Sequence, residues 1–220
     1  MGKPQKVALF DGFAAVGKAF ASGRRAELID VIAQGERSVE ELAGEVEQSV
    51  ANTSQHLQVL SRAGLVQARR DGNRVLYRLA GDAVGELWSA VRAVASQHLA
   101  GLDRLAADYL GDRSGLDEVS RAELLRHLGD GVVVWDVRPS AEFEAGHVPG
   151  AVSVPPGEVR RRLRSVPKDA QVVAYCRGPF CVFADDAVRE LRAKRRRAGR
   201  LEDGFPEWRR AGLPVVVGPE

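Results

Sequence analysis

Residues 170–182 have the sequence Ala170-Gln171-Val172-Val173-Ala174-Tyr175-Cys176-Arg177-Gly178-Pro179-Phe180-Cys181-Val182. The β-branched run at the start suits a buried strand of a parallel sheet. The Gly-Pro pair ends that strand in a loop, and an amphipathic stretch at 182–193 predicts a helix. A strand, a loop with two cysteines and a helix in this order indicate an α/β unit.

The same alternation surrounds this stretch. A second β-branched run lies at 131–137, and amphipathic stretches occupy 121–128 and 158–163. Before them, turn-forming and charged residues at 111–115 separate this half from a largely helical one. We therefore expect two domains, 1–110 and 116–220, joined by a linker at 111–115. The first would be mainly α, and the second α/β with a mostly parallel sheet.

In the N-terminal half, two helices are predicted around a tight connection. Ser38 is a good N-cap for one, and Ser49 for a second over residues 50–62, where Val50, Leu57 and Leu60 share one face. Short polar side chains near the start of the second helix suit base edges and phosphates. This pattern is typical of a helix-turn-helix.

A hairpin is predicted directly afterwards, because Asp71-Gly72 separates two β-rich runs within 65–79. Five arginines lie between residues 62 and 78, so the hairpin is a basic wing able to neutralise phosphates. The candidate DNA-binding residues are Ser49, Asn52, Ser54, Gln55, His56, Arg69, Arg70, Asn73 and Arg74.

The stretch at 55–66 (Gln-His-Leu-Gln-Val-Leu-Ser-Arg-Ala-Gly-Leu-Val), followed by Arg74-Val75-Leu76-Tyr77, resembles the ArsR (ArsR/SmtB) family of winged helix-turn-helix repressors. The similarity spans about residues 8–110. It implies binding to a double-stranded DNA operator as a homodimer, through flanking helices at 10–21 and 83–110. Family members often have polar residues where this chain has Val50 and Ala51.

Many members of that family sense metals, which requires a suitable ligand set. Residues 38–48 contain no cysteine, and the last helix offers only His98 with Asp103 and Asp108 at poor offsets. Zinc normally takes four ligands, so we expect no metal and no cofactor.

The C-terminal half resembles the rhodanese domain over about residues 116–218. Three ordered motifs carry the resemblance: Asp136-Val137-Arg138-Pro139 with Glu142 to Ala151, the loop from Cys176 to Cys181, and Asp203 to Trp208 with Ala211 to Val215. Cys176 follows a buried strand and precedes a helix, so loop amides and the helix start can favour its thiolate or an anionic persulfide.

We expect Cys176 to be the sulfur carrier, with Arg177 attracting anions. The active-site loop would also contain Gly178, Pro179, Phe180 and Val182. Asp136 and Arg138 are expected to form a structural ion pair, and His147 to be a packed loop residue. The basic run at 192–200 is either a solvated helix face or an attractor for anionic sulfur donors.

Cys181 departs from the rhodanese pattern, which commonly has Arg or Lys at this sixth loop position. Loss of that cation disfavours rapid thiosulfate turnover. Cys181 is either a resolving thiol that attacks a Cys176 persulfide or a buried, inert residue.

Composition sets outer limits. The net charge of +2 is too small to indicate nucleic-acid binding by itself. The indication comes from the local cluster of arginines between residues 62 and 78. No apolar stretch approaches the roughly 18 residues of a membrane helix, and no secretion signal is evident, so we expect a cytoplasmic protein without membrane contact.

Three functions fit these features. The first is a repressor that senses sulfide, polysulfide, thiosulfate or oxidant through Cys176. The second is a sulfurtransferase that acts by a Cys176 persulfide and uses the winged helix for localisation or dimerisation. The third is a metal-responsive or constitutive regulator whose rhodanese-like half binds a partner.

Overall fold

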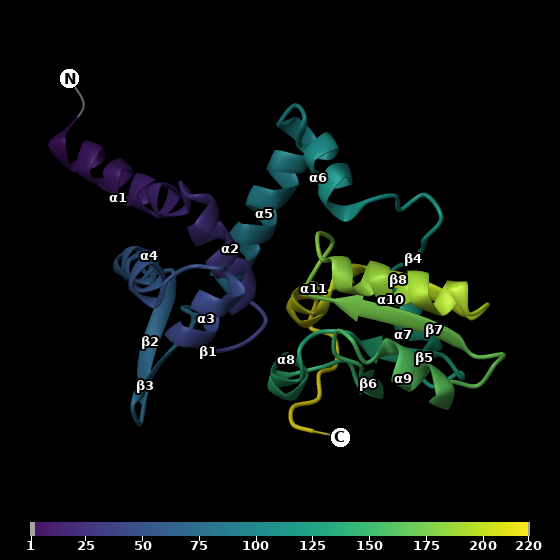
Figure 1. Ribbon diagram of the computed structural model, residues 1–220. Helices are drawn as coiled ribbons and strands as arrows, with labels where there is room; N and C mark the ends of the chain where they lie inside the picture. Colours follow the sequence, from purple (N-terminus) through teal and green to yellow (C-terminus); the bar gives the residue numbers. More distant parts are fainter. Residues whose placement is uncertain (1–2, 220) are drawn as a thin grey trace. The chain divides into compact units, whose positions relative to one another are not determined.

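The computed structural model describes residues 3–219, and its contacts divide the chain into two compact units between Ala93 and Val94 (Figure 1). The division falls inside α5 (Asp82–His98), so this helix belongs to both units. The first unit also contains α1 (Pro4–Phe20), α2 (Gly23–Ile32), β1 (Arg37–Ser38), α3 (Val39–Glu45), α4 (Val50–Arg62), β2 (Val66–Asp71) and β3 (Arg74–Leu79).

Serine caps fix the starts of α3 and α4, as predicted. Ser38 Oγ accepts the amide of Glu41 while the Glu41 carboxylate accepts the amide of Ser38, which completes a capping box. Ser49 Oγ accepts the amide of Asn52 at 3.2 Å. The expected face of α4 was wrong in one position: Val50 is 45% exposed, and Thr53 is buried with Leu57 and Leu60 instead.

The wing is an antiparallel hairpin of β2 and β3, as predicted. Asp71 pairs with Arg74, and Gly72 turns the chain with a positive φ of 59° that favours glycine. The sequence did not predict β1, whose two residues pair with β3 and give the strand order β1-β3-β2.

The second unit continues from α5 through α6 (Leu102–Leu110) into an α/β fold. Its further elements are β4 (Asp117–Val119), α7 (Arg121–His127), β5 (Val133–Asp136), α8 (Ser140–Ala145), β6 (Ala151–Ser153), α9 (Val159–Arg162), the 3-10 helix η1 (Leu163–Ser165), β7 (Gln171–Cys176), α10 (Val182–Ala193), β8 (Arg197–Gly204) and α11 (Phe205–Arg210). The five strands are all parallel in the order β4-β8-β7-β5-β6.

Two apolar cores cover the two faces of this sheet, because side chains alternate along each strand. From β7, Val172, Ala174 and Cys176 pack against α9 and α10, and Val173 and Tyr175 face the core formed with α7, α8 and α11. Cys176 therefore ends β7 on the side that α10 covers.

None of the helices found between residues 3 and 219 combines the length and the apolar character that a membrane span needs.

Candidate functional site

The carboxyl ends of the central strands bring the candidate sulfur site together. Asp136 ends β5 beside Tyr175, and Cys176 ends β7 opposite Gly204 at the end of β8. In open parallel sheets this edge is where ligands bind. Side chains distant in sequence thus meet around Cys176.

Cys176 and Cys181 are joined by a disulfide bond. Their Cα atoms lie 6.3 Å apart, a separation that the loop Gly178-Pro179-Phe180 spans without leaving the usual range for disulfides. Cys176 is buried, while Cys181 is half-buried and occupies the N-cap position of α10, just before Val182. The two thiols are therefore close enough to react with each other.

The loop amides are not all directed at the sulfur of Cys176. The amide of Cys181 donates to the carbonyl of Gly178 at 3.2 Å, which closes a turn within the loop. Phe180 at the tip of this turn is 37% exposed. The helix start at residue 182 still lies next to the disulfide, as the sequence indicates.

Arg177 is held by Glu142 of α8 rather than extending freely from the loop. Its Nη2 donates to Glu142 Oε1 at 2.6 Å and its Nε to the same oxygen at 3.0 Å. Glu142 is fully buried, so the carboxylate balances the guanidinium charge beside Cys176. The attraction of anions by Arg177 stays a prediction.

Asp136 and Arg138 form a fully buried ion pair at 2.5 Å beneath the site. The hydroxyl of Tyr175 donates to Asp136 Oδ2 at 2.6 Å and accepts the amide of Val148 at 3.1 Å. Burial raises the pKa of Tyr175 well above its usual value, and the neighbouring Asp136 carboxylate adds to this shift. His147 is completely buried, with Nδ1 2.9 Å from a backbone carbonyl.

Gly204 lies directly against the backbone of the loop. A Cβ atom there would meet the amide nitrogen of Gly178 at 2.3 Å and the carbonyl carbon of Arg177 at 2.4 Å. Only a residue without a side chain therefore allows β8 to support the loop at this point.

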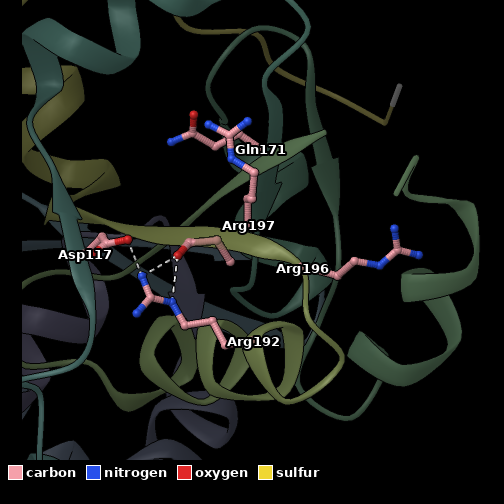
Figure 2. Close-up of a pocket in the computed structure, with 6 residues that line it drawn as sticks. Asp117, Gln171, Arg192, Arg196 and Arg197 are labelled. Atoms are coloured by element: carbon pink, nitrogen blue, oxygen red, sulfur yellow. Dashed lines mark hydrogen bonds and ion pairs between the residues drawn. The ribbon is translucent and has the colours of Figure 1, made fainter. Parts of the chain in front are cut away.

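Arg192, Arg196 and Arg197 of the basic run line a hollow away from this edge, whereas Arg200 pairs with the buried Asp185 of α10. The hollow, of about 400 Å³, lies beside Gln171 and Arg197 (Figure 2), which begin β7 and β8, whereas Cys176 ends β7. Arg192 binds the carbonyl of Ala198 and the carboxylate of Asp117 (Figure 2).

The candidate DNA-binding side chains of α4 lie at its first two turns. Ser49 and Gln55 are exposed, while Asn52, Ser54 and His56 are half-buried. Asn52 donates to the side chain of Gln48 at 2.6 Å, so its amide is already oriented by a neighbour.

The wing side chains differ in how free they are. Arg70, Asn73 and Arg74 are exposed on the hairpin. Arg69 instead binds Glu36 through Nε at 2.8 Å and through Nη2 at 2.5 Å. This bond raises the pKa of Arg69 and balances its charge, so Arg69 is the wing arginine with least attraction left for a phosphate.

Comparison with known proteins identifies the family that each half resembles. Residues 22–68 match the family model for bacterial regulatory proteins of the arsR family, and residues 120–211 match that for rhodanese-like domains. An HTH-type transcriptional regulator of Mycobacterium tuberculosis is 49% identical over 215 residues, which cover 97% of this chain and 94% of the relative. The chain belongs to this family of ArsR-type transcriptional regulators with a rhodanese-like domain.

Two further relatives each match one half of the regulator. A sulfurtransferase of Allochromatium vinosum is 31% identical over 104 residues, which are 46% of this chain and 96% of that protein. One solved structure is the homodimeric winged helix-turn-helix DNA-binding domain of a possible ArsR-family regulator from Mycobacterium bovis. That domain is 45% identical to this chain, with a TM-score of 0.42, and the match covers 45% of this chain and 92% of the domain.

Three residues at the candidate site had no assigned role from the sequence. Glu142 and Gly204 lie inside the quoted rhodanese motifs, so the motifs could have pointed to them. Arg113 belongs to the predicted linker and contacts the cysteine loop from there. Its role depends on the three-dimensional path of the chain, for which one arginine among turn-forming residues gives no signal.

Proposed function

We propose that this regulator is a homodimeric repressor that binds an operator when Cys176 and Cys181 are reduced and releases it when they become a disulfide. The observation that carries the proposal is the bond between these two cysteines in a rhodanese-type loop. A sulfur at position 181, where rhodaneses commonly have a cation, favours a change of state over rapid turnover.

The chemistry needs an oxidant, and hydrogen polysulfide is the class that a rhodanese-type loop suits. The Cys176 thiolate attacks a terminal sulfur of H₂S₂, the S–S bond breaks, and hydrosulfide leaves. The Cys181 thiolate then attacks Cys176 Sγ of the resulting persulfide and expels a second hydrosulfide. Two thiols and one H₂S₂ thus give one disulfide and two H₂S, so the cysteines lose two electrons and the polysulfide gains them.

Operator binding would use the first turns of α4 in the major groove and the wing on the phosphates. For the dimer we propose the exposed apolar side chains of the helices that flank the winged helix. Phe10 and Phe13 are 58% and 63% exposed on α1, and Val94 on α5 is 60% exposed. Exposed side chains this apolar indicate a surface that another protein surface covers, which here would be the second copy of the chain in the dimer.

We propose residues 111–115 as the functional boundary between the DNA-binding half, 1–110, and the sulfur-sensing half, 116–220.

The free-energy coupling that the switch requires between the sulfur state and operator binding is modest. A hundredfold loss of operator affinity corresponds to about 2.7 kcal/mol between the two states.

The test is operator titration in defined sulfur states. A duplex selected from a random library by the reduced protein is titrated with reduced, polysulfide-treated and re-reduced protein, and mass spectrometry counts the sulfur atoms on each cysteine. We expect roughly hundredfold weaker binding after polysulfide treatment, reversed by reduction. Cys176→Ser and Cys181→Ser should bind in both conditions, and the same response in either variant would reject the proposal.

A sulfurtransferase is the second candidate, because the Allochromatium vinosum relative of the C-terminal half carries that name. It requires Cys176 to cycle freely between thiolate and persulfide. Turnover from thiosulfate to cyanide that is undiminished in Cys181→Ser, together with operator binding that ignores the sulfur state, would favour it over the repressor.

A further inference from the structure

Arg113 joins the segment after α6 to the cysteine loop by two hydrogen bonds and to α10 by a third. Its Nη1 donates to the carbonyl of Pro179 at 2.7 Å, and its Nη2 to the carbonyl of Cys181 at 3.4 Å. Its Nε donates to Asp185 Oδ2 at 2.5 Å. Two of these acceptors belong to the backbone of the loop that closes when Cys176 and Cys181 bond.

Helix α10 holds the same segment from the other direction. Asp185 and Arg189 are four residues apart on α10 and thus share a face. Arg189 Nη2 donates to the carbonyls of Leu110 and Asp112 at 3.1 and 3.0 Å. Since α10 begins directly after Cys181, the position of this cysteine, the start of α10 and the end of α6 form one connected set.

The contacts of Arg113 depend on the geometry of the loop. Two sulfur atoms that are no longer bonded must separate, and the residues between and beside them take up that movement. The carbonyls of Pro179 and Cys181 then change their positions relative to Arg113. A planar guanidinium with fixed donor directions is sensitive to such a change.

The regulator can lose Arg113 without leaving a bare buried charge. Asp185 is completely buried, but Arg200 lies 3.0 Å from its other oxygen and is also paired with Glu118. Arg113 itself is 22% exposed. Its removal therefore breaks the link to the loop while the Asp185–Arg200 pair stays in place.

We propose that Arg113 is a positioning residue that transmits the state of the Cys176–Cys181 pair to α6 and through it to α5. Apolar side chains of α6 such as Leu105 and Tyr109 are each 66% exposed, and on the proposed function this helix belongs to the dimer surface. The inference rests on that proposed function and adds the route by which the disulfide alters operator binding.

Thermodynamic reciprocity between disulfide formation and operator binding provides an experiment that tests this role. If oxidation weakens operator binding, operator duplex must raise the reduction potential of the disulfide by the same coupling. In the proposed homodimer a hundredfold difference in affinity is shared by two disulfides and corresponds to a shift of about 30 mV, because each tenfold factor is 29.6 mV for a two-electron couple. The reduction potential of the disulfide in the full chain is measured with and without saturating duplex. The proteins compared are wild type, Arg113→Ala, Arg113→Lys and Arg160→Ala.

We expect the full shift in wild type and in Arg160→Ala, whose side chain is 88% exposed and pairs with Glu190 at the other end of α10 from Cys181. Arg113→Ala should form the disulfide but lose at least three quarters of the shift, and Arg113→Lys should restore part of it. Thermal unfolding checks that each variant is folded. If Arg113→Ala does not fold, the shift in Arg113→Lys is the result that tests the role of Arg113.

The outcomes separate the two proposals. No shift in wild type would reject the proposed function and this inference with it. A shift in wild type that persists in full in folded Arg113→Ala, or in Arg113→Lys if the alanine variant does not fold, would leave the sensor intact and overturn the role of Arg113.

Discussion

Arg177, the residue after Cys176, is bound by the buried carboxylate of Glu142, with Nη2 and Oε1 2.6 Å apart. A cation next to Cys176 would attract anionic sulfur compounds, but this one is balanced. The regulator thus has a loop in which a nearby positive charge is held in place and largely neutralised by α8.

Removing the charge of Glu142 should therefore speed the reaction of Cys176 with anions. Glu142→Gln is expected to cost about 1–3 kcal/mol of unfolding free energy, because a charged hydrogen bond is lost. The reaction of the reduced loop with polysulfide should accelerate up to about tenfold, the effect of a 1.4 kcal/mol electrostatic change. Stopped-flow measurement of disulfide formation checks this, with exposed Glu144→Gln on the same helix as the control. A slower reaction in folded Glu142→Gln would contradict the expectation.

Gly204 should tolerate no side chain, because a Cβ atom there would lie 2.3 Å from the amide nitrogen of Gly178 in the loop. Gly204→Ala is expected to lower the free energy of unfolding by about 2–3 kcal/mol, since packed backbone cannot move aside cheaply. The displaced loop should also form its disulfide more slowly. Denaturant unfolding and thiol counting measure both effects. Gly115→Ala, where a Cβ meets nothing within 4 Å, is the control, and equal behaviour of the two variants would refute the argument.

Tyr175 should give the regulator a pH-dependent stability at alkaline pH. Burial raises its pKa in the folded state, so the folded protein keeps a proton that the unfolded chain releases above pH 10. The stability from the neutral hydroxyl is fully present below pH 10 and is lost as the pH rises further. Tyr175→Phe, which loses the hydrogen bonds to Asp136 and Val148, should be about 1–3 kcal/mol less stable at pH 7.

Denaturant unfolding of both proteins between pH 7 and pH 11 tests this sign. The difference in unfolding free energy between wild type and Tyr175→Phe should shrink above pH 10. Tyr109→Phe, at an exposed position, controls for general alkaline effects. A difference that stays constant or grows with pH would show that the hydroxyl does not titrate as argued.

Elements with a strong local signal were predictable from the sequence. Caps at Ser38 and Ser49, the Asp71-Gly72 turn and the β-branched run before Cys176 each fix structure through neighbouring residues. Local chemistry decides such elements, so the winged helix and the parallel sheet followed from the pattern. The exposed position of Val50 was missed because it lies in the first turn, where the capped end of α4 turns away from the core.

The partners within the site were not predictable in the same way. That Glu142 binds Arg177, and that Arg113 reaches the cysteine loop, depends on contacts across 35 and 66 or more residues. Charge patterning along the chain does not indicate which acid meets which base. Motif similarity identified the cysteines, but the tuning of their surroundings comes from the packed structure.

The wing arginines should contribute unequally to operator binding. Arg69 is bound by Glu36, whereas Arg70 is exposed beside it on β2. In a homodimer, Arg70→Ala removes two phosphate contacts, so the slope of log K against log salt should fall by about 1.8. Arg69→Ala should change the slope by much less, because Glu36 already balances its charge. Fluorescence anisotropy with the selected duplex across a series of salt concentrations measures both. A larger change for Arg69→Ala than for Arg70→Ala would mean that DNA displaces Glu36 and that the wing rearranges on binding.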